Sequence, residues 1–179
     1  DAVIKGLIHQ APHKQQRAMI QLCNRLSKQE ERDQLFVSIL IHNLSSYNAK
    51  RNLALLKEKK LLSNNNFLLF INQLSKKDAL QASQILNDLS HFNKRTQSLA
   101  RNIILPPFIK RKKHLALKWF KSFSTTQQNL AVPVLGLALR HLGPKLKKPW
   151  LKALSAEQRE LLQKSLSKTI DIQQKNTTP

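Results

Sequence analysis

Glycine is scarce in this sequence, and its scarcity excludes several kinds of active site. Only 3 of the 179 residues are glycine, too few to build a glycine-rich phosphate loop, a Walker motif or a nucleophile elbow. Strand signals are scarce as well, because valine and tyrosine are few and the hairpin dipeptides Asn-Gly and Asp-Gly do not occur. Apolar residues recur with helical spacing instead, and the sequence therefore predicts an all-α protein.

A single cysteine, Cys23, excludes any disulfide within the chain. It lies in an apolar helical pattern with Met19, Ile20, Leu22 and Leu26, which favours a small buried side chain over a reactive thiol. The lack of disulfides fits a reducing compartment. No apolar run is long enough to span a membrane, and the first residues lack the pattern of a signal peptide. We therefore expect a cytoplasmic location, including the cytoplasmic face of a membrane complex.

Acidic residues are few, and their positions do not predict a catalytic or metal site. The chain holds 10 Asp+Glu against 31 Lys+Arg, and nearly all of the acids lie in first turns of helices or beside bases, where helix-dipole and i,i+4 effects alone would place them. His9 and His13 are separated by Pro12, which breaks the helix that would align them for a metal. The remaining histidines are isolated in the sequence: His42, His91, His114 and His141. We expect no metal, no cofactor, no small-molecule substrate and no enzymatic activity.

Capping boxes mark several helix starts, since a serine hydroxyl accepts a hydrogen bond from the third helical amide while a Glu or Gln reaches back. Such boxes stand at Ser27–Glu30 and Ser155–Gln158, and further versions stand at Ser75–Asp78 and Ser124–Gln127. Prolines 106–107 and 144 occupy expected helix starts, whereas Pro133 is expected to kink or split its helix. The expected helices are 2–10, 13–26, 28–43, 47–60, 64–73, 76–89, 92–104, 107–122, 125–142, 145–153 and 156–173.

The serine starts recur along the chain. Ser27, Ser75 and Ser124 are separated by 48 and 49 residues, and Ser155 follows 31 residues later. This recurrence favours stacked helical pairs or triplets, as in an armadillo- or HEAT-like α-solenoid; an irregular helical bundle that happens to use serine caps is the alternative. We expect one helical-repeat domain over residues 1–173, with a subdivision near 104–107 and a frayed tail at 174–179.

The stretch "LPPFIKRKKHLALKWFKSF", residues 105–123, mixes bases with aromatic residues. On a helix its bases separate from its rings, because one arc holds the apolar side chains and the opposite arc holds most of the bases. The apolar arc contains Phe108, Ile109, Leu115, Ala116, Trp119, Phe120 and Phe123, with Lys112 intruding on it. The aromatic side chains are therefore expected in the core, where they cannot act as stacking platforms for nucleic-acid bases.

The base-lined face continues into a long interval without acids. No Asp or Glu occurs between Asp88 and Glu157, whereas ordinary solvated faces carry both signs of charge. A region of one sign costs self-repulsion and indicates a polyanionic partner; a basic surface kept only for solubility is the alternative. The candidate partner-binding residues are Lys110, Arg111, Lys113, His114, Lys118, Lys121, Arg140, Lys145, Lys147, Lys148 and Lys152.

The segment "LGLALRHLGPKLKKPWLKALSAEQRELLQKSL", residues 135–166, resembles the C-terminal domain of FliG, the flagellar rotor switch protein. Leu137–Arg140 stand where that family has Leu-Ala-Leu-Lys, and Leu154–Ser155 match a Met-Ser turn before a long helix. A looser likeness, at Phe67–Leu86, is to the armadillo-like repeats of the same family's middle domain. The family's Glu-His-Pro-Gln motif and charged torque helix have no counterpart here. The resemblance thus implies a stacked-helix scaffold that docks other proteins, rather than a torque generator.

Together these observations favour a non-enzymatic basic scaffold or adaptor, a subunit of a larger assembly such as flagellar or secretion machinery, that docks an acidic protein. The alternative is a nucleic-acid-binding helical-repeat protein that contacts the phosphate backbone with little base readout. A third hypothesis is peripheral attachment of the same surface to an anionic membrane.

Overall fold

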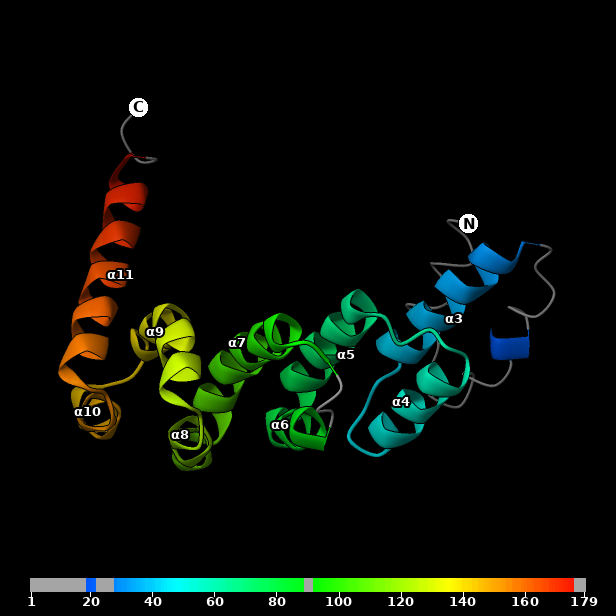
Figure 1. The fold of residues 1–179 in the computed structure, drawn as a ribbon, viewed down its shortest axis with the longest axis horizontal. Coiled ribbons are helices and arrows are strands. Elements are labelled where there is room, and N and C mark those ends of the chain that lie inside the picture. The colour runs from blue at the N-terminus through cyan, green and yellow to red at the C-terminus, as the bar shows by residue number, and fades with distance from the viewer. Residues whose placement is uncertain (1–18, 22–27, 89–91, 176–179) are drawn as a thin grey trace. The chain divides into compact units, whose positions relative to one another are not determined.

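The computed structural model describes residues 19–21, 28–88 and 92–175, with side chains up to Leu166. Throughout these residues the chain forms helices and turns and contains no strand, which confirms the all-α prediction (Figure 1). The helices are α3 (Gln29–His42), α4 (Ala49–Glu58), α5 (Asn64–Lys77), α6 (Ala79–Asp88), α7 (Lys94–Arg111), α8 (Lys113–Lys121), α9 (Thr125–Leu139), α10 (Pro144–Ala153) and α11 (Ala156–Lys175).

The chain divides into two compact units, the first ending at Ile85 and the second beginning at Leu86. The first unit contains α3, α4, α5 and most of α6, and the second contains α7 to α11. Residues 104–107, where a subdivision was expected, lie inside α7. Whether residues 1–173 act as one repeat domain stays a prediction.

Side-chain caps begin helices α5, α7, α9 and α11 at regular intervals. The side chains of Ser63 and Asn93 accept from the amides of Asn66 and Thr96. Ser124 and Ser155 form two of the four predicted capping boxes, in which the side chains of Gln127 and Gln158 accept from the serine amides. The caps lie 30, 31 and 31 residues apart (63, 93, 124, 155). The caps therefore recur about every 31 residues, which matches the interval from Ser124 to Ser155 and is shorter than the serine intervals of 48 and 49 residues.

Of the two remaining serine starts, Ser75 differs from the prediction and Ser27 lies outside the described residues. Ser75 is buried inside α5, where its hydroxyl donates to the Asn72 carbonyl. Helix α5 continues past it because Phe70, Ile71 and Leu74 share its buried face. The carboxylate of Asp78 instead accepts from the Gln81 amide at the start of α6. Helix α3 has Lys28 at its N-cap, without a side-chain cap bond, and Ser27 lies outside the described residues.

Buried positions follow the same repeat. Seven residues after each cap stand Phe70, Ala100, Ala131 and Leu162, and all four are buried. Eleven residues after the first three caps stand Leu74, Ile104 and Leu135, which are also buried. Positions 7 and 11 lie one turn apart on the same helical face, so each repeat buries an equivalent apolar stripe.

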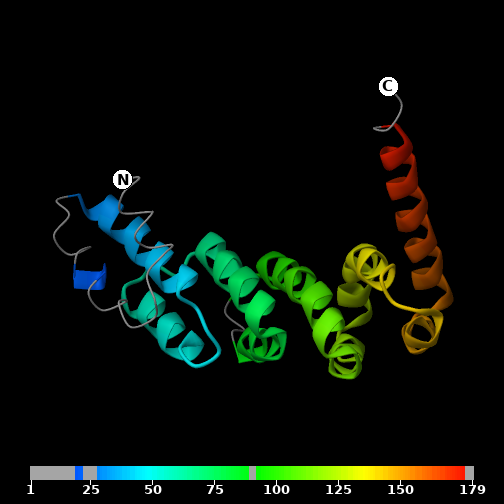
Figure 2. The same cartoon turned by 180° about the vertical axis from the view of Figure 1, so that it is seen from behind.

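In the second unit, α9 packs between α7 and α11, and α8 packs against α7. Both cartoon views place α8 and α10 along the same edge of this unit (Figures 1 and 2). The ring centroids of Phe120 in α8 and Trp150 in α10 lie 5.8 Å apart, which joins these two helices directly. The second unit therefore consists of two stacked helical pairs, α7–α8 and α9–α10, followed by α11.

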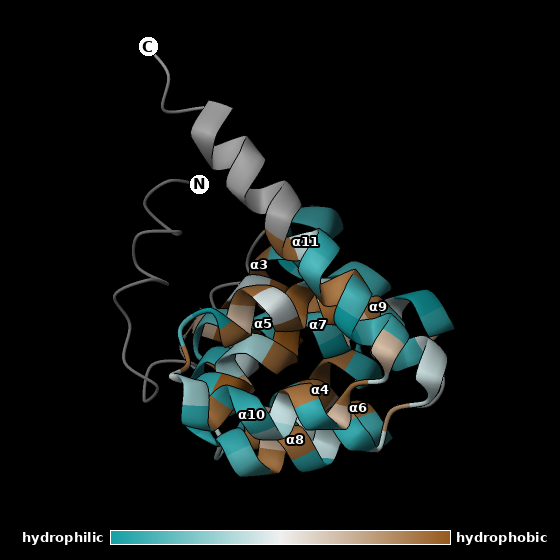
Figure 3. Ribbon diagram, turned by 90° about the vertical axis from the view of Figure 1, so that its left-hand side faces the viewer, coloured by the Kyte–Doolittle hydropathy of each residue, from teal (hydrophilic) through white to brown (hydrophobic). Residues whose placement is uncertain are grey.

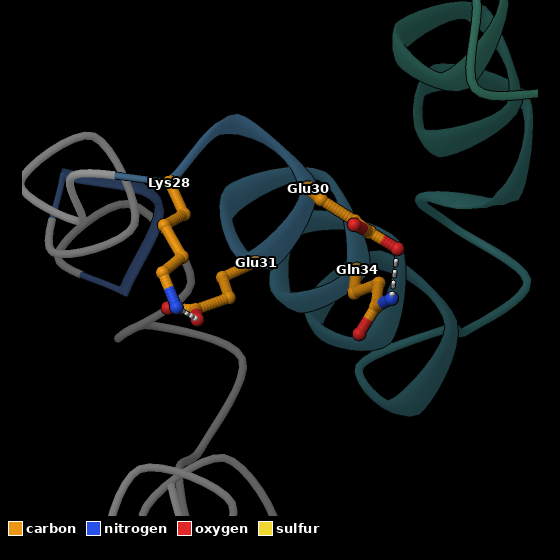
Figure 4. A network of polar contacts seen from close by, with 4 residues as sticks. All are labelled: Lys28, Glu30, Glu31 and Gln34. Carbon is orange, nitrogen blue, oxygen red and sulfur yellow. Dashed lines mark hydrogen bonds and ion pairs between the residues drawn. The ribbon is translucent and has the colours of Figure 1, made fainter.

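In the first unit, α3 packs against α4 and α5. The buried side chain of Asn52 in α4 donates to the Leu40 carbonyl at 2.9 Å, and the Lys77 amine donates to the Leu44 carbonyl. At the start of α3, Lys28 forms an ion pair with Glu31 at 3.3 Å, and the Gln34 amide donates to Glu30 at 3.4 Å (Figure 4). Two acids of this basic chain are thus engaged at one helix start.

Proline positions account for the largest error in the predicted helices. Pro106 and Pro107 lie within the continuous helix α7, and the chain breaks later, at Lys112, whose φ and ψ are −138° and 63°. Proline inside a helix costs stability because it removes backbone hydrogen bonds. Burial of Leu105 and Phe108 on either side of the prolines offsets this cost, since each buried large side chain stabilises the fold by about 1.5–3 kcal/mol. The expected helix 107–122 is therefore wrong. Helix α9 likewise runs without a break through Pro133.

Some predictions fall outside the described residues. The expected helix 2–10, all of 13–26 except the helical residues 19–21, and Cys23 cannot be compared with the structure. Helix α11 extends to Lys175, so the first two residues of the expected tail are helical.

Candidate functional site

An aromatic cluster fixes the orientation of α8. Trp119 lies 5.7 Å from Phe108 and 4.7 Å from Phe123 between ring centroids, and Phe120 lies 5.7 Å from Phe123. All four rings are buried, which confirms that the aromatic residues of this stretch belong to the core. Leu115, predicted in the same apolar arc, is 44% exposed. The break at Lys112 rotates α8 relative to α7, so a single helical wheel through both segments misplaces it.

The bases of α8 point away from this cluster. Ala116, Trp119 and Phe120 are buried, and about 100° of rotation per residue places three exposed bases on the opposite side. These are His114, Lys118 and Lys121. Lys110 and Arg111 are exposed at the end of α7, and Lys113 is half-buried at the first turn of α8.

A second row of bases comes from α10. Trp150 is 1% exposed and sets the rotation of this short helix about its axis. The exposed bases are Lys145, Lys148 and Lys152, while Lys147 is half-buried. Figure 3 shows the largely hydrophilic colouring of α10. We refer to the exposed bases of residues 110–121 and 145–152 together as the basic surface.

Two arginines of the acid-free interval serve the packing of the second unit. The guanidinium of Arg140 donates to the Leu166 carbonyl at 3.0 Å and so links the end of α9 to α11. The guanidinium of Arg101 lies 5.5 Å from the centre of the Phe123 ring, within cation–π range, and burial lowers the pKa of Arg101. Arg140 was predicted as a partner-binding residue, and the structure gives it an internal hydrogen bond instead of full exposure.

Part of the basic surface borders a hollow at the corner between α10 and α11. Its volume is about 440 Å³, and it is lined by Pro144, Lys147, Lys148, Leu151, Lys152 and Arg159. The first five lie on one face of α10, at spacings of three and four residues, and Arg159 comes from the first turns of α11. We call this feature the basic hollow.

Sequence reasoning missed three residues of the basic hollow. Pro144 and Leu151 are not charged, and Arg159 lies beyond the acid-free interval, after Glu157. The i, i+3, i+4, i+7 and i+8 spacing from Pro144 to Lys152 identifies one face of a helix. Whether Arg159 lines the hollow, however, depends on the direction of α11 relative to α10, which this spacing does not determine.

The first unit holds a larger groove, of about 780 Å³. Most of its lining residues belong to α3 and α5, and they include the apolar Val37, Ile41 and Leu69 and the acidic Glu30 and Asp33. Within the part of the chain that the structure describes, no cluster of three or more His, Cys, Asp or Glu residues is arranged to hold a metal. None of the described helices is both long and apolar enough to cross a membrane.

Comparison with family models, with curated proteins and with solved structures finds no match for this chain.

Proposed function

We propose that this chain is a non-enzymatic helical-repeat scaffold that docks an acidic protein on its basic surface as a subunit of a larger assembly. One observation carries the proposal. The outward faces of two neighbouring helices, α8 and α10, expose several bases, and the stretch of sequence that contains both helices has no Asp or Glu. Such a surface repels itself and attracts a negatively charged partner.

Exposed leucines favour a protein as that partner. Leu115 in α8 and Leu151 in α10 lie among the bases and are 44% and 39% exposed. Helix α9, which carries no charged residue, exposes Leu130 and Leu137 as well. A protein surface matches apolar side chains and charges together, whereas a phosphate backbone matches the charges alone.

The resemblance of residues 135–166 to FliG suggests the kind of assembly, namely flagellar or secretion machinery. This extends the proposal to a cytoplasmic subunit located at the cytoplasmic face of a membrane complex. The helical pairs and the basic surface are compatible with that role, which is one of docking and not of catalysis.

Charge reversal tests the proposal. In a variant carrying Lys118→Glu, Lys121→Glu and Lys148→Glu, we expect the loss of an acidic protein that the unaltered chain recovers from nuclease-treated native lysate. The control reverses three exposed lysines of the first unit, Lys50, Lys57 and Lys76, and so changes the net charge equally. Far-ultraviolet circular dichroism should show the same helicity in all three proteins. Equal recovery by both variants would contradict the proposal.

Nucleic acid is the second candidate, because a net charge of +21 and rows of exposed bases suit phosphate contacts. A gel-shift titration with duplex and single-stranded DNA and RNA at two salt concentrations tests it. If the chain contacts phosphates, the logarithm of the binding constant must fall linearly with the logarithm of the salt concentration. The absence of a shift at low salt excludes nucleic-acid binding. For the membrane hypothesis, co-sedimentation with anionic vesicles is the corresponding test.

A further inference from the structure

The basic hollow is lined by two apolar residues and by four bases, which we call its cationic rim. Pro144 and Leu151 supply the apolar part, and Leu151 stands between Lys147 and Lys148 on the same face of α10. Lys152 and Arg159 complete the rim. A volume of about 440 Å³ lies within the range of small binding pockets.

A buried polar network holds the start of α11, the helix that carries Arg159. Gln158, the residue before it, is 2% exposed, and its amide donates to the side-chain oxygens of Gln128 at 3.1 Å and Asn129 at 2.8 Å. The oxygen of the same amide accepts from the Ser155 backbone at 3.1 Å. The first turn of α11 is therefore tied to α9, and Arg159 is presented at the rim from a rigid element, which reduces the ordering cost of binding.

The chemistry of the basic hollow points away from single-stranded nucleic acid. Single-stranded nucleic acids bind proteins through aromatic stacking platforms combined with bases, but the aromatic residues of the second unit are buried. These are Phe92, Phe108, Trp119, Phe120, Phe123 and Trp150. The exposed apolar group beside the bases is instead an aliphatic leucine, which suits an apolar side chain of a protein.

We propose that the basic hollow binds an acidic peptide segment of the partner, with one large apolar side chain of that segment seated on Leu151 and Pro144 and its flanking carboxylates paired with the rim. This inference rests on the proposed docking of an acidic protein and names the kind of segment that is recognised. Burial of the apolar group on Leu151 supplies selectivity, and the charges of the rim supply attraction and orientation.

Three fluorescent probes test it on the full chain by anisotropy at constant salt. One is an acidic peptide of Asp and Glu with a central Phe, the second replaces that Phe with Ser, and the third is oligo(dT) of similar charge. We expect the Phe peptide to bind the unaltered chain about tenfold more tightly than the Ser peptide, which corresponds to 1.4 kcal/mol. Substitution Leu151→Ser should abolish this preference and leave binding of the Ser peptide unchanged.

Leu115→Ser is the matched control, because Leu115 is a similarly exposed leucine that lies beside the bases of α8 and outside the basic hollow. This variant should keep the tenfold preference. Arg159→Gln should weaken both peptides, and a thermal melt of each variant verifies folding. If both peptides bind the unaltered chain equally, the inference fails while docking of acidic proteins stands. If oligo(dT) binds and neither peptide does, the proposed function fails together with the inference.

Discussion

Gly136 lies where α9 meets α11, and the contact between these helices depends on its missing side chain. A Cβ atom at this position would stand 3.0 Å from Leu162 Cδ1 and 3.2 Å from Ser165 Oγ. Leu162 is itself buried and has little room to move in a close-packed interior. Glycine in mid-helix costs roughly 0.5–1 kcal/mol relative to alanine, so its presence here is explained by close packing.

Replacing Gly136 with valine should therefore destabilise the chain. We expect Gly136→Val to lower the free energy of unfolding by about 1–3 kcal/mol through overpacking, as measured by urea denaturation. Gly143→Ala is the control, because a Cβ there meets nothing within 4 Å. An equal loss in both variants would show that helix packing at Gly136 is not the cause.

Glu160 carries a pH-dependent contact that can be measured directly. A hydrogen bond from Lys164, at 2.7 Å, lowers the pKa of this exposed carboxyl, and the positive charge of Lys164 adds to the effect. Since the folded-state pKa is depressed, the contact is present above the ordinary pKa of the carboxyl and is lost as the pH falls through the lowered value. In Lys164→Ala the Glu160 pKa, followed by NMR titration, should rise toward its ordinary value. An unchanged pKa would contradict the ion pair.

At the scale of elements, helix starts follow rules that the sequence displays in part. The boxes at Ser124 and Ser155 are correctly predicted because the serine and the glutamine both belong to one local pattern. Asn93 and Ser63 were not recognised, since neither is followed by Glu or Gln at the third position. Ser75 was misassigned because Asp78, three residues later, imitates a box while being the cap itself.

Removing these serines should distinguish a cap from a helix-interior residue. Ser124→Ala should lower the free energy of unfolding by about 1 kcal/mol, which corresponds to roughly 2–4 °C in Tm for a chain of this size. Ser75→Ala should leave Tm unchanged or raise it, because alanine is the better helix former and the serine hydroxyl bonds only within α5. A loss at Ser75 comparable to that at Ser124 would contradict the boundaries of α5.

At the scale of the whole molecule, the large positive net charge destabilises the folded state. A net charge of +21 produces self-repulsion in the folded chain, and the acid-free interval concentrates part of it in the second unit. Salt screens exposed charges, since the Debye length falls from about 30 Å at 0.01 M to about 10 Å at 0.1 M.

Stability should accordingly increase with moderate salt. If raising NaCl from 0.01 M to 0.1 M increases the free energy of unfolding by about 1 kcal/mol, Tm should rise by roughly 2–4 °C. Circular dichroism measures this change. The variant carrying Lys118→Glu, Lys121→Glu and Lys148→Glu lowers the net charge from +21 by two for each of three residues, and its Tm should rise less. A decrease of Tm with salt would mean that favourable ion pairs outweigh the repulsion.

Much of the fold could be predicted from the sequence, because helices are encoded by local patterns. Apolar periodicity and the scarcity of glycine predicted an all-α chain, and several boundaries agree to within a few residues, as in α3, expected at 28–43 and found at Gln29–His42. The burial of Trp119 and Phe120 also followed from spacing along one helix. These inferences require only residues that are close in sequence.

Features that depend on contacts between residues distant in sequence could be read only from the tertiary structure. Helix α7 continues through Pro106 and Pro107 because Leu105 and Phe108 are buried around them, a contribution that local propensity does not contain. The basic hollow exists because Trp150 sets the rotation of α10 while the Gln158 network, which reaches α9, holds Arg159 beside it. The sequence by itself determined the helices and the sign of the charge. Packing determined which bases, and which leucine, meet at one place.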